Sequence, residues 1–237
     1  MDALINPERL PNERPIPKRG ILFINPNEAH FAVQNAIKLG GRRQYLFNSN
    51  LIVLKEYNVF IAGPCIGAPM AVMVLEKLIA LGANEFIVFG WCGSLTPELT
   101  CETLFLPIRG FSEEGTSDHY PVNGNPNSSE KLRTIAVACA ERTSTPCQEG
   151  VIWTTDAPYR ETRSKIQAYQ RLGAVAVDME FTALCTVAKF RKANMAAMYL
   201  VSDELWREKW QSAFNRKGFK KRSQKIIMSL FEYFLMI

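Results

Sequence analysis

Histidine is scarce in this chain of 237 residues, which has only His30 and His119. Two histidines cannot build a histidine-rich metal centre, and no acidic cluster has the spacing of a calcium loop. No CxxC pair occurs among the six cysteines, most of which stand among apolar neighbours: Cys65, Cys92, Cys101, Cys139, Cys147 and Cys185. This pattern predicts reduced, buried thiols of a cytoplasmic protein without disulfides, and we expect neither a metal nor another cofactor.

Long hydrophobic runs are also missing from the sequence. Nowhere do about 18 apolar residues follow one another, and the opening residues 1–19 are polar and proline-rich, unlike a signal peptide. The chain is therefore expected to be soluble, not secreted and not embedded in a membrane. Much of its formal charge of +5 comes from residues 216–225, which favours a solvated basic helix over a nucleic-acid-binding surface.

The chain does contain an alternation of strand-like and helix-like segments behind a short arm. Residues 1–19 carry several prolines and no periodic apolar face, so they predict an extended arm, and residues 20–237 predict a single α/β domain. The expected strands lie within residues 20–24, 45–63, 86–90, 104–111, 174–178 and 196–203. The expected helices lie within residues 28–40, 69–82, 128–143, 163–173, 180–193 and 220–236.

Ligands of open α/β sheets gather beyond the carboxyl ends of strands. The segments at such ends are INPNE (24–28), GWCGSL (90–95) and SDEL (202–205). GWCGSL has neither the spacing of a phosphate loop nor that of a dinucleotide fingerprint. It predicts a flexible turn whose glycines let the backbone approach a flat ligand. The alternative is an ordinary turn in which Trp91 fills a gap in the core.

Three acidic residues follow apolar strands. In AVDMEFTAL (176–184), Asp178 is expected to cap the helix that follows, because negative charge suits a helix N-terminus. Glu180 leads the apolar part of that helix, so we expect it to be buried and hydrogen-bonded to protein donors or to ligand hydroxyls. For Asp203, in YLVSDEL (199–205), capping of a following helix and a role in ligand binding both stay open.

In their order and spacing these segments resemble the nucleoside phosphorylase superfamily, which includes uridine phosphorylases, purine nucleoside phosphorylases and methylthioadenosine/adenosylhomocysteine nucleosidases. The resemblance covers residues 20–206 and leaves 207–237 outside. It implies a three-layer α/β/α fold with a mixed, partly barrel-like central sheet, assembled as a homodimer or a higher oligomer. The matching segments are CIGAPMA (65–71), EFIVFGWCGSL (85–95), EEGTSDHY (113–120), TTDAPYRET (154–162), GAVAVDMEFTAL (173–184) and LVSDEL (200–205).

The resemblance implies cleavage of a nucleoside N-glycosidic bond through a cationic sugar, which the protein would stabilise. Glu180 would accept hydrogen bonds from the ribose hydroxyls, with Met179 packed on the sugar. Asp203 matches the aspartate that donates to the imidazole nitrogen of a purine, which favours a purine substrate. Tyr159 and Arg160 leave recognition of a different base as an open alternative. The remaining predicted substrate contacts are Trp91, Cys92, Gly93 and His119, the last at the 5′ end of the sugar or as a loop-stabilising residue.

The sequence departs from phosphorylases where they bind phosphate. INPNEAH (24–30) replaces a GDPxR-like loop, Val88 replaces an arginine, and Trp91 replaces a small hydroxyl residue. Loss of two guanidinium groups and a hydroxyl weakens binding of a dianion, and Trp91 would fill the phosphate position as a plug or a stacking wall. Hydrolysis is therefore slightly favoured, with Glu28 as the base that activates water and His30 as a rival. A carboxylate that merely suits the helix dipole is the alternative for Glu28.

Two other functions stay open. A phosphate-dependent purine or uridine phosphorylase would hold phosphate as co-substrate through Arg42, Arg43 or Arg160. The first two would serve the site of a neighbouring subunit. A non-catalytic nucleoside-binding protein would keep Glu180 and Asp203 without turnover. In the C-terminal segment, residues 220–236 have apolar side chains on more than one face, which favours burial or an oligomer interface over peripheral membrane contact.

Overall fold

The computed structural model describes residues 3–124 and 127–235. Within these residues the strands form one mixed sheet in the order β10-β9-β6-β7-β8-β5-β1-β4-β3-β2. The strands are β1 (Arg19–Phe23), β2 (Arg42–Leu46), β3 (Ser49–Leu54), β4 (Val59–Gly63), β5 (Glu85–Ser94), β6 (Leu104–Ser112), β7 (Cys147–Thr154), β8 (Ala174–Asp178), β9 (Asn194–Glu204) and β10 (Gln211–Ser212). The helices are α1 (Pro26–Lys38), α2 (Ala68–Ala80), α3 (Glu130–Thr143), α4 (Arg163–Arg171), α5 (Phe181–Phe190) and α6 (Lys217–Leu235).

Part of the sheet closes on itself. Strand β5 pairs with β8 on one side and with β9 along its whole length, and β9 continues through β6 and β7 back to β8. These five strands therefore form a barrel. The open part continues from β5 through the parallel strands β1 and β4 to an antiparallel edge made of β3 and β2. The predicted mixed, partly barrel-like sheet is confirmed.

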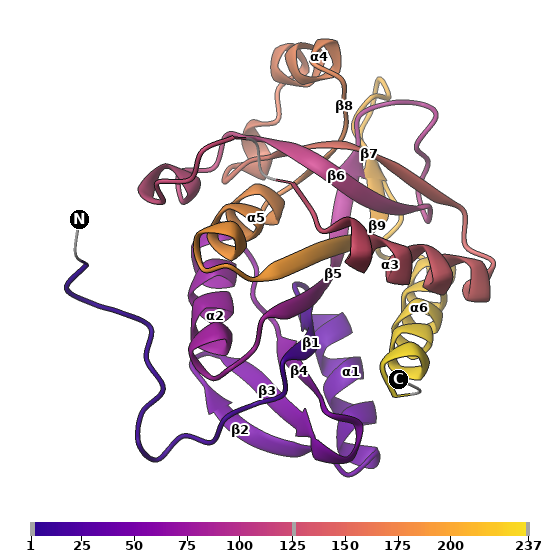
Figure 1. The fold of residues 1–237 in the computed structure, drawn as a ribbon. Coiled ribbons are helices and arrows are strands. Elements are labelled where there is room, and N and C mark those ends of the chain that lie inside the picture. The colour runs from indigo at the N-terminus through magenta and orange to yellow at the C-terminus, as the bar shows by residue number, and fades with distance from the viewer. Residues whose placement is uncertain (1–2, 125–126, 236–237) are drawn as a thin grey trace.

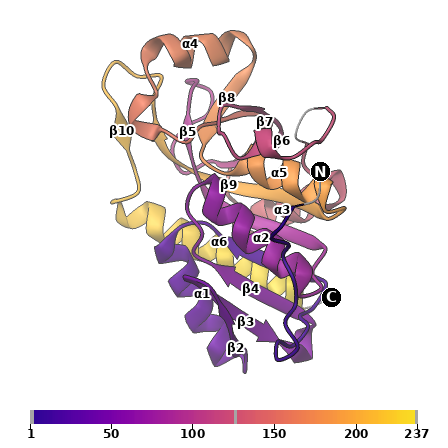
Figure 2. The same ribbon diagram turned by 90° about the vertical axis from the view of Figure 1, so that its left-hand side faces the viewer.

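Helices cover both faces of this sheet. Figure 1 shows α2 and α5 on one side and α1, α3 and α6 on the other, and in Figure 2 α2 lies in front of the sheet with α6 behind it. Each group buries its apolar residues against the strands in a separate core. The predicted three-layer arrangement is thus confirmed. In the described part of the chain, no helix is long and apolar enough to span a membrane.

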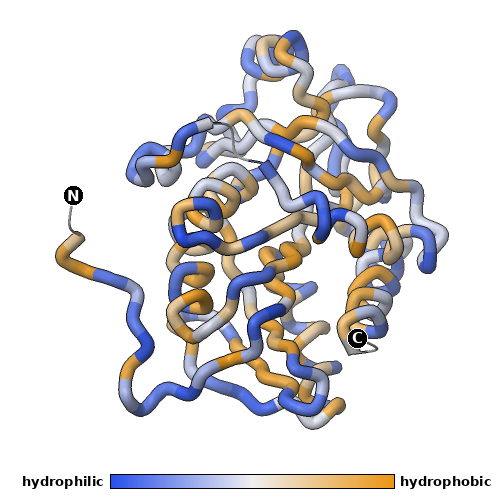
Figure 3. Tube along the Cα trace, in the orientation of Figure 1, coloured by the Kyte–Doolittle hydropathy of each residue, from blue (hydrophilic) through white to orange (hydrophobic). Residues whose placement is uncertain are grey.

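Residues 3–18 contain neither helix nor strand and run along α2 (Figure 1). The Ile16 N–H donates to the carbonyl of Leu81, and the Lys77 ammonium group donates to Glu8 O over 2.7 Å and to Glu13 Oε2 over 2.6 Å. The hydropathy colours alternate along this segment in Figure 3, which agrees with its lack of a continuous apolar face. Polar contacts with Lys77 and Leu81 therefore help to hold residues 3–18 against α2.

The structure corrects several expected elements. GWCGSL is not a turn, because residues up to Ser94 continue β5, where β9 supplies backbone partners beyond Trp91. Strand β7 and most of β2 were not predicted, since their polar and glycine-containing sequences have little apolar alternation. The expected helix 220–236 begins earlier, at Lys217, and residue 236 lies outside the described residues. All six cysteines are free thiols, but Cys147 is exposed.

Candidate active site

The N-termini of α2 and α5 meet at Glu180. This residue precedes α5 and is only 3% exposed, as the sequence predicts. Its Oε1 accepts a hydrogen bond of 2.6 Å from the backbone N–H of Gly67, which precedes α2. Gly67 has a φ of +84°, a conformation that a residue with a Cβ rarely adopts. The turn before α2 therefore presents a backbone donor to the Glu180 carboxylate.

Asp178 organises the start of α5. Its Oδ2 accepts from the backbone N–H groups of Glu180 (3.1 Å) and Phe181 (2.7 Å), and its Oδ1 accepts from Thr154 Oγ1 over 2.6 Å. The predicted capping role is therefore confirmed. Burial raises the pKa values of both Asp178 and Glu180, and the neighbouring Asp178 charge raises that of Glu180 further. Repulsion between the two buried carboxyl groups therefore favours a proton bound within the pair at the end of the barrel.

A groove of about 970 Å³ lies against α2, and neither Asp178 nor Glu180 is among the residues that line it. Its walls come from the N-terminal arm, from α2 including Pro69, and from the loop that carries His119. Asp156 lines the same groove, accepts from the Gly115 N–H over 2.9 Å, and contributes a smaller upward effect on the pKa of Glu180. The loop itself is held by buried Glu114, which accepts from hydroxyl and backbone groups around it. Exposed His119 lines the groove, and its predicted roles, at the 5′ end of a sugar or in stabilising its loop, both stay predictions.

Asp203 lies near the end of β9 and accepts on both carboxylate oxygens. Ser202 Oγ donates to Oδ1 over 2.6 Å, and Trp210 Nε1 donates to Oδ2 over 2.8 Å. Opposite it, a Cβ on Gly93 would come within 2.3 Å of Leu205 Cδ1 and 3.3 Å of Asp203 Oδ2. A side chain at Gly93 would therefore displace the Leu205 side chain that packs over this position. No helix follows Asp203 directly, which removes the capping alternative.

A second cavity, of about 390 Å³, contains Asp203. Glu161 lines it as well, immediately after the short helix η3 (Pro158–Arg160). Burial raises the pKa of Glu161 to about 8, and the charges of Asp203, Asp178 and Glu113 act in the same direction. Fully exposed Tyr159 is at the rim, whereas Arg160 is exposed and does not line this cavity. The other lining residues are Pro158, Arg163, Ile166, Leu205, Arg207, Glu208 and Trp210.

The residues expected at a phosphate position lie on the other face of the sheet. Glu28 is only 6% exposed in α1, and its Oε1 accepts a 2.9 Å hydrogen bond from Ser223 in α6. Burial raises the pKa of this carboxyl. Trp91 stacks on Phe214 at a centroid distance of 6.0 Å and packs edge-on against Phe219 at 5.3 Å. Glu28 and Trp91 therefore belong to the layer of α1 and α6, whereas Glu180 leads α5 on the opposite face.

Of the other predicted site residues, some lie near α5 and the rest lie elsewhere on the surface. Met179 is partly buried beside Glu180, and Cys92 is buried in the core that contains α5. His30 is exposed, with its Nε2 2.8 Å from Nε2 of Gln34. Arg42 and Arg43 are exposed on the edge strand β2 and line a separate groove of about 650 Å³. The charge of Asp178 therefore acts on both Glu180 and Glu161, and Glu161 shares a cavity with Asp203, whereas Arg42 and Arg43 lie in a different groove.

The sequence of this chain is similar to that of known enzymes. A family model described as "Phosphorylase superfamily" matches residues 18–232. The chain belongs to this superfamily. A purine nucleoside phosphorylase of the DeoD type from Exiguobacterium is 26% identical over 155 residues, which are 64% of this chain and 65% of that relative. The chain thus covers just under two thirds of that relative's length.

Solved structures show the same fold. A purine nucleoside phosphorylase from Toxoplasma gondii, in complex with immucillin-H, superposes with a TM-score of 0.79 at 16% identity, covering 93% of this chain and 91% of that one. A 5′-methylthioadenosine/S-adenosyl homocysteine nucleosidase from Campylobacter jejuni gives a TM-score of 0.76 at 18% identity, covering 92% and 98%. The fold is therefore shared by phosphorolytic and hydrolytic enzymes, and it does not by itself select either reaction.

Sequence reasoning missed several residues around the candidate site. Asp156 and Glu161 flank Tyr159 in TTDAPYRET, but isolated carboxylates carry no signal of burial. Trp210 lies beyond residues 20–206, on which the sequence resemblance rested, although the family model includes it, and its link to Asp203 depends on the pairing of β10 with β9. Among the described residues, no three His, Cys, Asp or Glu side chains are grouped as metal ligands would be. The carboxylates of this region are spread over two cavities instead.

Proposed function

We propose that this protein hydrolyses the N-glycosidic bond of a nucleoside, with a purine as the favoured base. The observation that carries the proposal is Glu180, a buried carboxylate held by a backbone N–H at the meeting point of two helix N-termini. Such a group suits ribose hydroxyls, which would supply the further hydrogen bonds that a buried carboxylate requires. As the bond to the base breaks, the growing positive charge of the sugar would favour ionisation of Glu180 and Asp178, and the two carboxylates would stabilise that charge.

The charge around this site supports hydrolysis over phosphorolysis. The charge of Asp178 and, more weakly, that of Asp156 raise the pKa of Glu180. Two further carboxylates therefore surround this residue. A phosphate dianion would be repelled there unless cations compensated it. Arg42 and Arg43 line a groove apart from Glu180, and Trp91 is held by Phe214 and Phe219. Water, which carries no charge, fits this environment better than phosphate.

In the proposed reaction, different residues bind the sugar and the leaving base. Glu180 would orient the ribose, with Met179 packed against it, and the Asp203 region would receive the leaving base. Water would then attack carbon 1 of the sugar cation. Glu28 lies on the other face of the sheet from Glu180 and is bonded to Ser223, so its role as general base stays a prediction.

We also propose that the chain assembles with further copies of itself into a homo-oligomer. The groove of about 970 Å³ is lined by apolar side chains that are exposed in the single chain, including Ile5, Leu10, Phe47 and Met73. Covering these side chains with a second copy would remove apolar surface from water. We place the protein in the cytoplasm, since its six cysteines are free thiols. Light scattering coupled to size-exclusion chromatography tests the assembly, and a monomer at micromolar concentration would contradict it.

The experiment that tests the function is product analysis with purine and pyrimidine nucleosides, in phosphate-free buffer and again with phosphate. We expect free ribose and free base without phosphate, and a loss of about 100-fold or more in kcat/KM for Glu180→Gln, because the transition state loses a negative partner. Glu98→Gln removes an exposed carboxylate elsewhere and serves as control. Ribose 1-phosphate formed only with added phosphate would instead establish a phosphorylase, and binding without turnover would establish a nucleoside-binding protein.

A further inference from the structure

A buried tyrosine reaches towards the Asp178 carboxyl without completing a hydrogen bond. Tyr199, on β9, is fully buried, and its hydroxyl oxygen has no hydrogen-bond partner among the described residues. Burial raises the pKa of this phenol, and the charges of Asp178 and Glu180 raise it further, while the nearby phenol opposes the rise in the pKa of Asp178 that burial causes. A buried hydroxyl without a partner costs free energy, so its place beside the pair calls for an explanation.

Strand pairing explains how Tyr199 reaches this position. Tyr199 lies opposite Gly90 in the parallel pairing of β9 with β5. Val177, the residue before Asp178, lies opposite Gly93 in the antiparallel pairing of β8 with β5. A Cβ on Gly90 would come within 2.9 Å of Tyr199 Cε1, so the ring lies over β5 where that strand has no side chain. The phenol therefore crosses from β9 over β5 towards the end of β8, where Asp178 stands.

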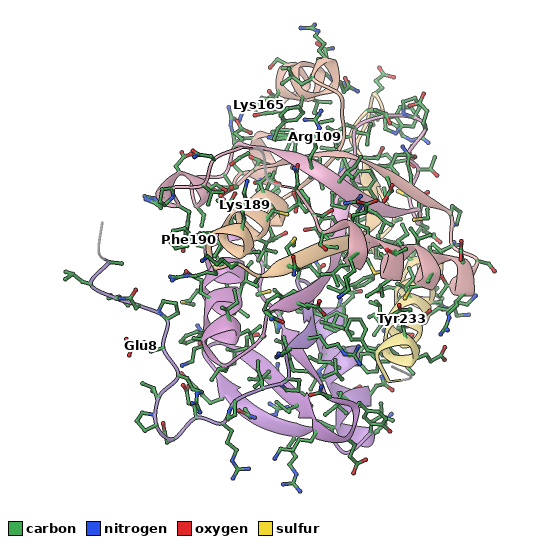
Figure 4. The ribbon with its side chains drawn as sticks, viewed as in Figure 1. Glu8, Arg109, Lys165, Lys189, Phe190 and Tyr233 are labelled. Carbon is green, nitrogen blue, oxygen red and sulfur yellow. The ribbon has the colours of Figure 1, made fainter. Side chains whose placement is uncertain are left out.

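The donors to the Asp178–Glu180 pair are neutral in the described part of the chain. The two carboxyl groups accept from one hydroxyl and from backbone N–H groups, and no ion pair reaches either of them. Helix α5 carries a single charged side chain, Lys189, which Figure 4 labels next to Phe190 in the last turn, remote from Glu180. The other titratable groups that interact with the pair include Asp156, Cys65, Cys92 and Cys185. A further hydroxyl donor is therefore the support that this surrounding can offer to an ionised pair.

We propose that Tyr199 is a positioning residue whose hydroxyl donates a hydrogen bond to the Asp178 carboxylate when the sugar becomes cationic. This inference rests on the proposed function and adds a residue to it. While a proton is bound within the Asp178–Glu180 pair, the phenol stays unpaired. Positive charge on the sugar draws the pair into its ionised form, with release of the proton to water, and hydrogen bonds to a charged acceptor are about twice as strong as neutral ones. A contact that strengthens in the transition state raises kcat without tightening the binding of substrate.

Tyr199→Phe removes the hydroxyl and keeps the ring over Gly90. Tyr233→Phe is a matched control, because Tyr233, labelled in Figure 4, is a partly buried tyrosine of α6 that packs in the core on the other face of the sheet. Both variants are assayed in phosphate-free buffer with the nucleoside that wild type cleaves fastest. We expect Tyr199→Phe to lose about tenfold in kcat with KM unchanged within about twofold, and Tyr233→Phe to match wild type.

Three further measurements separate positioning from packing. The acidic limb of the kcat profile should move up by about one pH unit in Tyr199→Phe, because the pair ionises less readily without the phenol. The free energy of unfolding should not fall, since an unpaired buried hydroxyl is removed while the ring still packs. In an Asp178→Asn background, Tyr199→Phe should change kcat by less than about twofold, because the amide has no ionised form to stabilise.

Each contrary result overturns the inference. If Tyr199→Phe has the kcat and the pH profile of wild type, the hydroxyl does not serve the reaction, while the hydrolase proposal stands. A lower kcat with a lower free energy of unfolding and an unmoved acidic limb would assign the hydroxyl to folding. A full loss in the Asp178→Asn background would show that the hydroxyl acts through another group. If wild type releases no base from any nucleoside, the proposed function itself fails, and the inference fails with it.

Discussion

The backbone N–H of Gly67 donates to Oε1 of Glu180 across 2.6 Å, although 113 positions separate the two residues in sequence. The contact joins the turn before α2 to the residue that precedes α5. It depends on a backbone conformation that glycine adopts readily, with φ at +84°. The geometry of one turn is therefore coupled to the carboxylate on which the proposed chemistry depends.

Gly67→Ala tests this coupling. A side chain at this φ and ψ, +84° and +145°, costs about 1–3 kcal/mol, so relaxation of the turn would move the N–H away from Glu180 and lower kcat/KM. Gly40 is a matched control, because its φ is +83° and an added Cβ would also meet nothing within 4 Å. Urea unfolding should show similar losses of stability for the two variants, and only Gly67→Ala should lose activity. Equal kcat/KM values for the Gly67 and Gly40 variants would show that the Gly67 turn does not position Glu180 for the reaction.

Ser223 in α6 donates a hydrogen bond to the buried Glu28 carboxyl. Ser223→Ala leaves that group without its donor, which should lower the free energy of unfolding by about 1–3 kcal/mol. Ser229→Ala is the control on the same helix, since Ser229 is also buried but its hydroxyl lies next to the Cys139 thiol instead of a carboxyl group. Denaturant titration of both variants checks the difference. A neutral Ser223→Ala would show that this contact contributes little to holding α6 on α1.

Trp210 is 61% exposed, yet its indole N–H binds Asp203. Trp210→Phe keeps an aromatic ring next to Phe214 and removes the donor. We expect unfolding free energy to change by no more than about 0.5 kcal/mol, because the side chain is largely in solvent. In contrast, kcat/KM should fall by about tenfold, equivalent to about 1.4 kcal/mol, as the Asp203 carboxylate loses its fixed position. Wild-type kinetics in this variant would mean that the hydrogen bond does not serve the reaction.

The raised pKa of Glu161 predicts how stability depends on pH. Its folded-state pKa is about 8, against an ordinary value of 4.5, so the unfolded chain releases this proton first as the pH rises. The stabilisation tied to the protonated group is complete below about pH 4.5 and is lost as the pH approaches and passes 8. Glu161→Gln should therefore match wild type near pH 4.5 and have the higher Tm above pH 8. A pH-independent difference in Tm would contradict a raised pKa.

Local patterns in the sequence were sufficient for much of the fold. Apolar runs and helical periodicity located β1, β8, β9, α1, α2 and α5, because these segments turn a regular face towards a core. AVDMEFTAL also predicted both the capping by Asp178 and the burial of Glu180. The same reasoning failed for GWCGSL, where two glycines suggested a turn. Pairing with the distant β9 keeps this segment in a strand.

The sequence by itself determined the superfamily, the three-layer fold and the acidic residues that end two of its strands, since each of these follows from short-range periodicity or from local motifs. Only the tertiary structure decided what each side chain meets. Glu28 was expected at the site and lies against Ser223, 195 positions away in sequence, while Glu161 was not expected and shares a cavity with Asp203. Burial, charge coupling and hydrogen-bond partners arise when distant strands pair and helices pack, so a linear pattern does not contain them.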